Sequence, residues 1–227
     1  MGLSDKQFTQ SNNSLSIIGG KFTKRVQEGT IGAISRKITK GKHEGETIYE
    51  VGYPTLSGFL ASGNLVDNEQ IGMQAVIILK DADGEYELSF SAGVKEMSQH
   101  LKAIIRSLPN IDPSKETFFS IKENPKKKTR TGNPVFNLGV YQDGHRVKDF
   151  YTEWHKNEKG ENVCTNLNGL PDAEKLRDGT YDYRDQNEFL LMRFEEYFSD
   201  FSPVEVKQQA AHQEADVPAD EEDDAPF

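Results

Sequence analysis

The residue types with the clearest chemical meaning in this chain are basic and aromatic side chains that alternate near its N-terminus. Residues 21–42 contain seven lysines and arginines but a single acid, Glu28. The segment begins with Lys21-Phe22-Thr23-Lys24-Arg25, in which an aromatic ring stands among cations. Single-stranded nucleic acid requires this combination, because cations neutralise its phosphates and aromatic rings stack on its unpaired bases. The pattern therefore indicates a single-stranded nucleic-acid ligand.

A second basic cluster, Lys126-Lys127-Lys128-Thr129-Arg130, is predicted in a loop between two strands. The alternative is a solvated loop without a ligand. Among the aromatic residues, Phe136 alternates with Leu138 and Val140 and is expected in the core, whereas Tyr141 on the opposite face is the better stacking residue. The residues predicted to contact a single strand are Lys21, Phe22, Lys24, Arg25, Arg36, Lys37, Lys40, Tyr49, Tyr53, Lys126, Lys127, Lys128, Arg130 and Tyr141.

Motifs that would indicate catalysis are missing from the sequence. It contains no GxxxxGK[ST], HExxH or GxSxG motif, and no GxGxxG after a predicted strand. The five histidines are scattered, and His155 stands nine residues before the single cysteine, Cys164. Metal sites made of His and Cys need closer spacing. We therefore expect a non-catalytic protein without a metal or another cofactor.

Acidic residues are concentrated at the C-terminus, although the formal net charge of the whole chain is -10. Residues 214–227 contain seven acids and no base. Without this segment, 30 acidic residues stand against 27 basic ones, so the remaining chain is close to neutral. A segment so acidic and so poor in apolar residues cannot bury enough surface to fold. The sequence predicts a disordered acidic tail over residues 202–227.

The tail ends in an apolar residue, Phe227, after a run of acids. A solubilising tail would not need the aromatic ring, whereas a basic pocket on a partner could hold both the ring and the terminal carboxylate. The residues predicted to bind a partner protein are Asp223, Asp224, Pro226 and Phe227.

The last five residues, Asp223-Asp224-Ala225-Pro226-Phe227, resemble the Asp-Asp-x-Pro-Phe tip of bacterial single-stranded DNA-binding proteins. An acidic tail ending in Phe is also typical of phage-encoded members. More loosely, residues 107–112 and 140–144 are similar to a group of phage single-stranded DNA-binding proteins. The resemblance implies an OB-fold body that coats single strands. It also implies a tail tip that recruits replication, repair or transcription enzymes and competes weakly with DNA for the cationic groove. The chain departs from the bacterial family in its larger body.

Short runs of β-branched and aromatic residues, separated by turn residues, predict a strand-rich body. Asp81-Ala82-Asp83-Gly84 predicts a hairpin between two of the strands, and Asp143-Gly144 predicts another. The predicted strands are 15–26 with a bend at Gly19-Gly20, 47–53, 55–60, 74–79, 85–90, 117–121, 135–141 and 147–151.

Two helices are predicted from apolar residues at three- and four-residue spacing. The first covers residues 94–108 and ends at Pro109, and the second covers about 185–201. The polar stretch 155–183 between them is expected to be irregular.

These elements predict a mainly β fold with α-helices: a small OB-like barrel with an inserted helix, a C-terminal helix and the acidic tail. The predicted organisation is a flexible arm over 1–13, one strand-binding domain over 14–201 and the tail over 202–227. The sequence has no apolar run of membrane-spanning length and no signal-peptide pattern. A cytoplasmic location is therefore expected, that of the host cell if the protein is phage-encoded. Self-association is left open.

The favoured function is that of a phage-type protein that coats single-stranded DNA in replication or recombination and recruits host or phage enzymes through its tail. One alternative is a DNA-binding transcription adaptor that recruits a phage RNA polymerase. Two further alternatives, a small nuclease and a DNA mimic, have less support from the residues.

The tail tip generates a first prediction. Phe227→Ala should leave affinity for single strands nearly unchanged, because no charge is altered. It should reduce capture of enzymes that recognise Asp-Asp-x-Pro-Phe tips by about tenfold or more, since burial of a phenylalanine ring is worth ~1.5–3 kcal/mol. A pull-down from host extract, with the two proteins compared at equal concentration, measures the effect. Equal capture would contradict a role for the tip.

Overall fold

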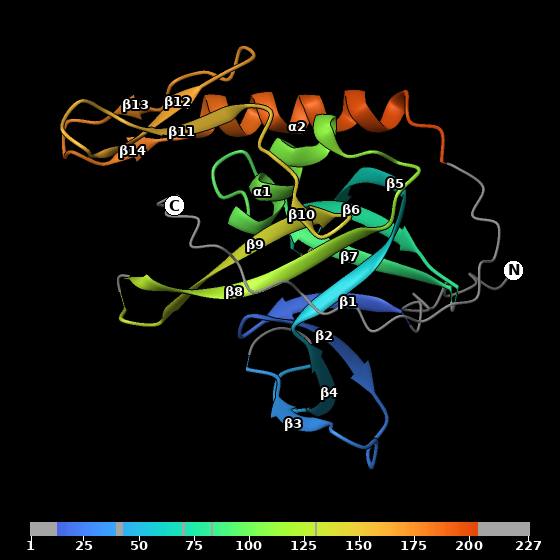
Figure 1. The fold of residues 1–227 in the computed structure, drawn as a ribbon. Coiled ribbons are helices and arrows are strands. Elements are labelled where there is room, and N and C mark those ends of the chain that lie inside the picture. Colours follow the sequence, from blue (N-terminus) through green and yellow to red (C-terminus); the bar gives the residue numbers. More distant parts are fainter. Residues whose placement is uncertain (1–12, 40–42, 70, 83, 130, 204–227) are drawn as a thin grey trace, which may run out of the picture.

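The computed structural model describes residues 13–39, 43–69, 71–82, 84–129 and 131–203. The expectations for the arm over 1–12, for Lys40 and Arg130, and for the tail from residue 204 onward lie outside these residues. In the described part, one large sheet, two small hairpins and two α-helices form the fold (Figure 1). The predicted mainly β architecture, with an inserted helix and a C-terminal helix, is confirmed.

The large sheet contains ten strands, and all but one of its neighbouring pairs are antiparallel. The exception is the parallel pair of β1 and β7. In spatial order the strands are β10 (His145–Arg146), β9 (Pro134–Gln142), β8 (Thr117–Lys128), β5 (Thr55–Asn68), β6 (Gly72–Lys80), β7 (Glu85–Ser91), β1 (Ser14–Ile18), β2 (Lys21–Val26), β4 (Thr47–Tyr53) and β3 (Ile34–Lys37).

Strand β5 pairs with two different strands along its length. Residues 55–58 pair with β8, whereas residues 59–68 pair with β6. The register is irregular between Leu60 and Ser62, near the point of change. Such a bulge bends a strand and increases its twist. The bend lets β5 join the two halves of the sheet around a common interior.

The interior is a single apolar cluster to which both halves of the sheet and both helices contribute. Alternation places Ile77 of β6, Leu88 of β7 and Phe119 of β8 on the inner face, each at most 1% exposed. The turn between β1 and β2 lies against β9, because a Cβ added to Gly20 would come 2.3 Å from the ring of Phe136. Phe136 is half-buried and packs on the core, as the sequence predicts.

Helix α1 (Gln99–Ser107) packs on β9, and a short 3-10 turn, η1 (Leu108–Asn110), follows it. The helix begins later than the predicted residue 94. Residues 92–97 instead form a turn in which Ala92 bridges to Met97, and Val94 is exposed. Proline at the start of η1 ends the α-helix, as expected.

Helix α2 (Arg184–Ser199) packs on α1 and β5 and lies at the end of the molecule opposite β3 and β4 (Figure 1). The prediction that residues 155–183 are irregular is wrong in part. Strands joined by tight turns form two hairpins there. Gly160 and Gly179 adopt positive φ in these turns. The hairpins pair β11 (Thr152–Lys156) with β12 (Asn162–Asn166), and β13 (Glu174–Lys175) with β14 (Tyr181–Asp182).

Two predicted strands have different lengths in the structure. The strand predicted at 117–121 continues to Lys128, because residues up to Asn124, and then Lys128, pair with β9. The strand predicted at 147–151 is instead a two-residue strand at 145–146. Phe150 then donates its backbone N–H to the Arg106 carbonyl, so the chain turns toward α1.

The contact of α2 with β5 generates a second prediction. A Cβ added to Gly63 would lie 2.3 Å from the ring of Phe198, so Gly63→Ala should displace this ring and lower the free energy of unfolding by about 1–3 kcal/mol. Gly93→Ala is the control, because its added Cβ meets nothing closer than 3.9 Å. Urea unfolding measures both variants. In a Phe198→Ala background the cost of Gly63→Ala should largely disappear, and an undiminished cost would contradict the assigned contact.

Candidate nucleic-acid interface

The first basic and aromatic cluster is divided between the two faces of the β2–β4–β3 sheet. Cross-strand partners lie on the same face, and Phe22 stands opposite Tyr53 while Val26 stands opposite Tyr49. The other face carries Arg25, which stands opposite Glu50. By the same register, Lys24, Lys37, Tyr49 and Tyr53 share the first face, and Lys21, Arg25 and Arg36 share the second.

Phe22 is not available to stack on a base, and its predicted role is wrong. Its side chain is 0% exposed and belongs to the apolar core. The ring lies on the strand face that continues the inner side of the large sheet, next to Ile17 of β1. Tyr53, across from Phe22, is 43% exposed and is the accessible ring of this face.

Two other residues of the first face have partners inside the protein. The Lys24 ammonium donates to the Asn13 side-chain oxygen at 2.8 Å. A hydrogen bond with Glu28 raises the pKa of the Tyr49 hydroxyl. Lys37, on the edge strand β3, is exposed. This face therefore offers Tyr53 and Lys37 to a ligand more readily than Lys24 or Tyr49.

The second face holds three cations and one carboxylate, that of Glu50. Arg36 donates two hydrogen bonds of 3.0 Å to Glu50, and this pairing raises the pKa of Arg36. Arg25 stands opposite Glu50 on the neighbouring strand, and the aliphatic stem of Lys21 lies across Gly52. One acid against three bases leaves a net positive charge on this face.

The second basic cluster lies at the end of β8 and not in a loop as predicted. Lys126, Lys127 and Lys128 are exposed, and the register with β9 is irregular between Asn124 and Lys128. In the described part of the chain, Lys127 and Lys128 form no ion pair. Two exposed cations without an acidic partner are available to phosphates.

Tyr141 lies on the outer face of β9, as predicted. A Cβ added to Gly139 would come 2.7 Å from its ring, so the ring lies across this glycine and not across a side chain. The residue opposite Tyr141 on β8 is Phe118, and the residue opposite it on β10 is Arg146. Tyr141 therefore stands between an aromatic and a basic side chain.

The sequence analysis missed Phe118 and Lys122 as candidates for this face. Both alternate with the buried Phe119 and Ile121, so they lie on the outer side of β8. The alternation is visible in the sequence. The register of β8 with β9, which no local pattern supplies, places Phe118 opposite Tyr141 and Lys122 opposite Asn137.

A backbone hydrogen bond joins the strands that carry the two clusters. Ile121 donates its N–H to the carbonyl of Pro54, at the junction of β4 and β5. Tyr53 precedes Pro54 and Lys122 follows Ile121, so the end of β4 lies beside the point at which β8 extends beyond β5. The β8–β9 hairpin and the β2–β4–β3 sheet leave this point in different directions (Figure 1).

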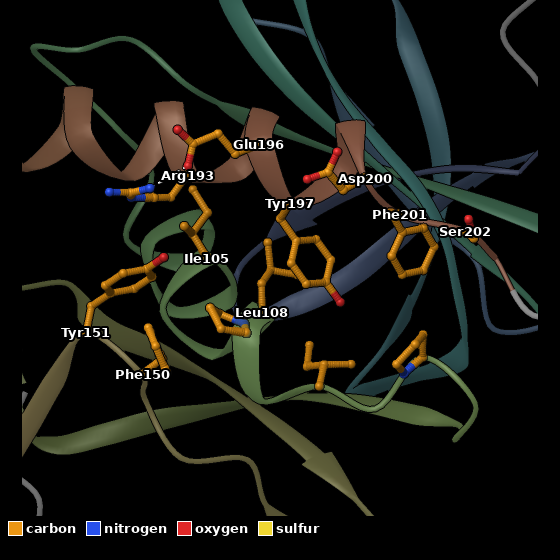
Figure 2. Close-up of a pocket in the computed structure, with 13 residues that line it drawn as sticks. Ile105, Leu108, Phe150, Tyr151, Arg193, Glu196, Tyr197, Asp200, Phe201 and Ser202 are labelled. Atoms are coloured by element: carbon orange, nitrogen blue, oxygen red, sulfur yellow. Dashed lines mark hydrogen bonds and ion pairs between the residues drawn. The ribbon is translucent and has the colours of Figure 1, made fainter. Parts of the chain in front are cut away.

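A separate cavity of about 560 Å³ lies between α1, η1 and the end of α2. Its walls are mainly apolar, with Ile105 and Leu108 on one side and Tyr197 on another (Figure 2). Three charged residues line it, of which Arg193 and Glu196 pair with each other at 2.5 Å and Asp200 is the third. Across the described residues, no three His, Cys, Asp or Glu side chains are grouped so that they could hold a metal ion.

Comparison with known proteins leaves the family open. No protein-family model matches the chain, and no match was found among curated proteins or solved structures. In the described ranges, neither helix has the length and apolar character needed to cross a membrane.

The ring of Tyr141 generates a third prediction. Tyr141→Ala should weaken binding of an oligo-dT by about 5- to 150-fold, because stacking on one base is worth ~1–3 kcal/mol. Tyr141→Phe keeps the ring and is the matched control. Fluorescence anisotropy of a labelled oligonucleotide measures both affinities. Equal affinities of the Ala and Phe variants would show that the ring does not stack on a base.

Proposed function

We propose that this protein is a non-catalytic single-stranded DNA-binding protein that coats strands and recruits enzymes through its acidic tail. The observation that carries the proposal is the β8–β9 hairpin, on which Tyr141 and Phe118 stand opposite each other. On the same hairpin Lys127 and Lys128 are exposed and have no acidic partner among the described residues. Aromatic rings and unpaired cations on one hairpin supply both interactions that an unpaired strand requires.

The chain order of the strands supports an OB-like body. Three antiparallel strands, β5 to β7, are followed by α1 and by the β8–β9 hairpin, which returns to pair with β5. OB-folds have this order of strands and an inserted helix, and they use the loop between their last two strands to bind oligonucleotides. In this chain Lys126, Lys127 and Lys128 lie at the end of β8, next to that connection.

The proposed path of the strand differs from the common OB path. OB-folds often bind ligands on the face of strands two and three, which correspond here to β6 and β7. That face carries two acids, Glu85 and Glu87, against one base, Lys80, which pairs with Glu85 at 3.5 Å, so the charge of Glu87 would repel phosphates. We therefore place the strand over the outer face of β8 and β9 and toward the second face of β2–β4–β3, which carries Lys21, Arg25 and Arg36. Tyr53 lies on the first, opposite face and stays outside this path.

DNA is favoured over RNA by the tail. The resemblance of its last five residues is to single-stranded DNA-binding proteins, and it supports a partner role for Asp223, Asp224, Pro226 and Phe227. The body supplies affinity for the strand, and the tail supplies the link to replication, repair or transcription enzymes. Neither role needs a cofactor.

Salt dependence generates a fourth prediction. The logarithm of the affinity for oligo-dT should fall linearly with the logarithm of salt concentration, by ~0.7 per phosphate neutralised. Changing Lys126, Lys127 and Lys128 together to Ala should weaken binding and reduce this slope. The thermal melting temperature should stay the same, because exposed charges contribute little to stability.

The matched control for this prediction changes three exposed lysines of the small hairpins, Lys156, Lys159 and Lys175, to Ala. The control removes the same charge from outside the large sheet. It should lower affinity much less at the same salt concentration. Equal losses in the two triple variants would mean that only net charge matters and that the β8–β9 hairpin is not the contact.

A further inference from the structure

A second cleft lies away from the outer face of β8 and β9, between the end of β7, the start of α1 and the start of α2. Its volume is about 540 Å³, within the ~300–1,000 Å³ of common ligand pockets. One wall comes from residues 91–102 and the other from residues 181–187. None of the lining residues belongs to the proposed DNA interface.

Lys102 of α1 lines this cleft and is only 6% exposed. Its ammonium lies 5.1 Å from the centre of the Tyr183 ring, and no carboxylate of the described residues pairs with it. Arg106 follows one turn later on α1, and its buried Nε has no hydrogen-bond partner within the described ranges. A buried cation without an anion is unfavourable unless a ligand supplies the negative charge.

Burial, together with the positive charge of Arg106, lowers the pKa of Lys102 to about 8. The other titratable residues that line the cleft are Lys95, Glu96, Tyr181, Asp182 and Tyr183. Asp182 is held by Arg184 at 2.6 Å, so its charge is already balanced. The first turn of α2 also borders the cleft, and the positive end of its dipole favours an anion there.

Two exposed rings stand beside the buried cation. Tyr181 is 52% exposed and Tyr183 is 46% exposed, and their ring centres are 6.3 Å apart. Exposed aromatic rings are surfaces on which a nucleobase stacks, and an ammonium binds the phosphate attached to it. The cleft thus combines, at one place, aromatic rings that can stack on the base of a nucleotide and an ammonium that can bind its phosphate.

We propose that this cleft binds one nucleotide unit, with its phosphate at Lys102 and its base against Tyr181 and Tyr183. The unit has two possible sources, a free nucleoside monophosphate or the phosphorylated end of a single strand. The proposal goes beyond the coating of strands, because the interior of a long strand does not present a terminal phosphate.

The test compares binding of thymidine monophosphate, thymidine and inorganic phosphate to the full chain by isothermal titration calorimetry. Thymidine monophosphate should bind at least about tenfold more tightly than either fragment. Lys102→Met should reduce its affinity by about tenfold or more. Inorganic phosphate binding as tightly as the nucleotide would show an anion site only, and no saturation by the nucleotide at millimolar concentration would overturn the proposal.

Two further variants separate a binding role from a structural one. Lys102→Met should melt no lower than the wild type, since an apolar side chain of similar length replaces a buried charge. Tyr183→Leu keeps the charge and removes the ring, so it should lower affinity for the nucleotide but not for inorganic phosphate. Lys156→Met, on β11, is the matched control and should bind the nucleotide like the wild type.

Proton uptake gives an independent measurement. Near pH 8, about half of the Lys102 side chains are neutral, and a bound phosphate should raise the pKa of Lys102. Nucleotide binding should therefore take up protons, seen as a binding enthalpy that varies with the ionisation enthalpy of the buffer. The Lys102→Met variant should lose this uptake, and retention of the full uptake would overturn the assignment to Lys102.

The two sources of the nucleotide are distinguished with oligonucleotides. A 5′-phosphorylated oligo-dT that binds more tightly than its unphosphorylated form would identify the strand end, and equal binding would leave the free nucleotide as the ligand. A circular single strand has no end, so Lys102→Met should bind it like the wild type. If Lys102→Met lost as much affinity for the circular strand as for the 5′-phosphorylated strand, the nucleotide site would be overturned. If the wild type failed to bind circular strands at all, the proposed function alone would be overturned.

Discussion

The fold depends on the division of β5 between two partners. Its first four residues pair with β8 and nine of its last ten with β6, so one strand belongs to both halves of the sheet. The bulge near Leu60 allows the change of partner without loss of the ladder on either side. Because of this bend, side chains from β6, β7, β8 and β9 meet in one core. The outer faces of the same strands are then left for other groups.

Glycines allow several close contacts that hold this arrangement together. The ring of Phe198 lies over Gly63, the ring of Phe136 over Gly20 and the ring of Tyr141 over Gly139. Each contact places an aromatic ring where a Cβ would otherwise stand. The first two join separate elements and pack a half-buried ring against the core, whereas the third lies along one strand and leaves Tyr141 on the outer face. A glycine under the ring thus allows two elements to pack closely at Gly63 and Gly20, and at Gly139 it lets the Tyr141 ring lie along the outer face of its own strand.

Much of the fold can be predicted from alternation in the sequence. Tyr86, Leu88 and Phe90 alternate with polar residues, and the predicted strand agrees with β7 within one residue. Prediction failed where pairing with a distant strand decided the outcome. Pro125 and three lysines favour a loop by composition, yet β8 continues there beside β9. Phe22 stands among cations in the sequence, but its pairing with β1 and β4 places it on the inner face. Candidate binding residues could therefore be predicted from their residue types. Which face of the sheet each one occupies could not, because it depends on the register between strands that are distant in the sequence.

The two edges of the ten-stranded sheet differ from its centre in a way that affects how copies of the protein meet. β10 has only two residues, and β3 carries Arg36 and Lys37 on a strand whose four residues are all exposed. Short or positively charged edges are poor templates for another strand, because pairing would bring like charges together or form few hydrogen bonds. Copies of the protein could therefore lie side by side without merging their sheets. The edges thereby protect the protein from aggregation at high local concentration.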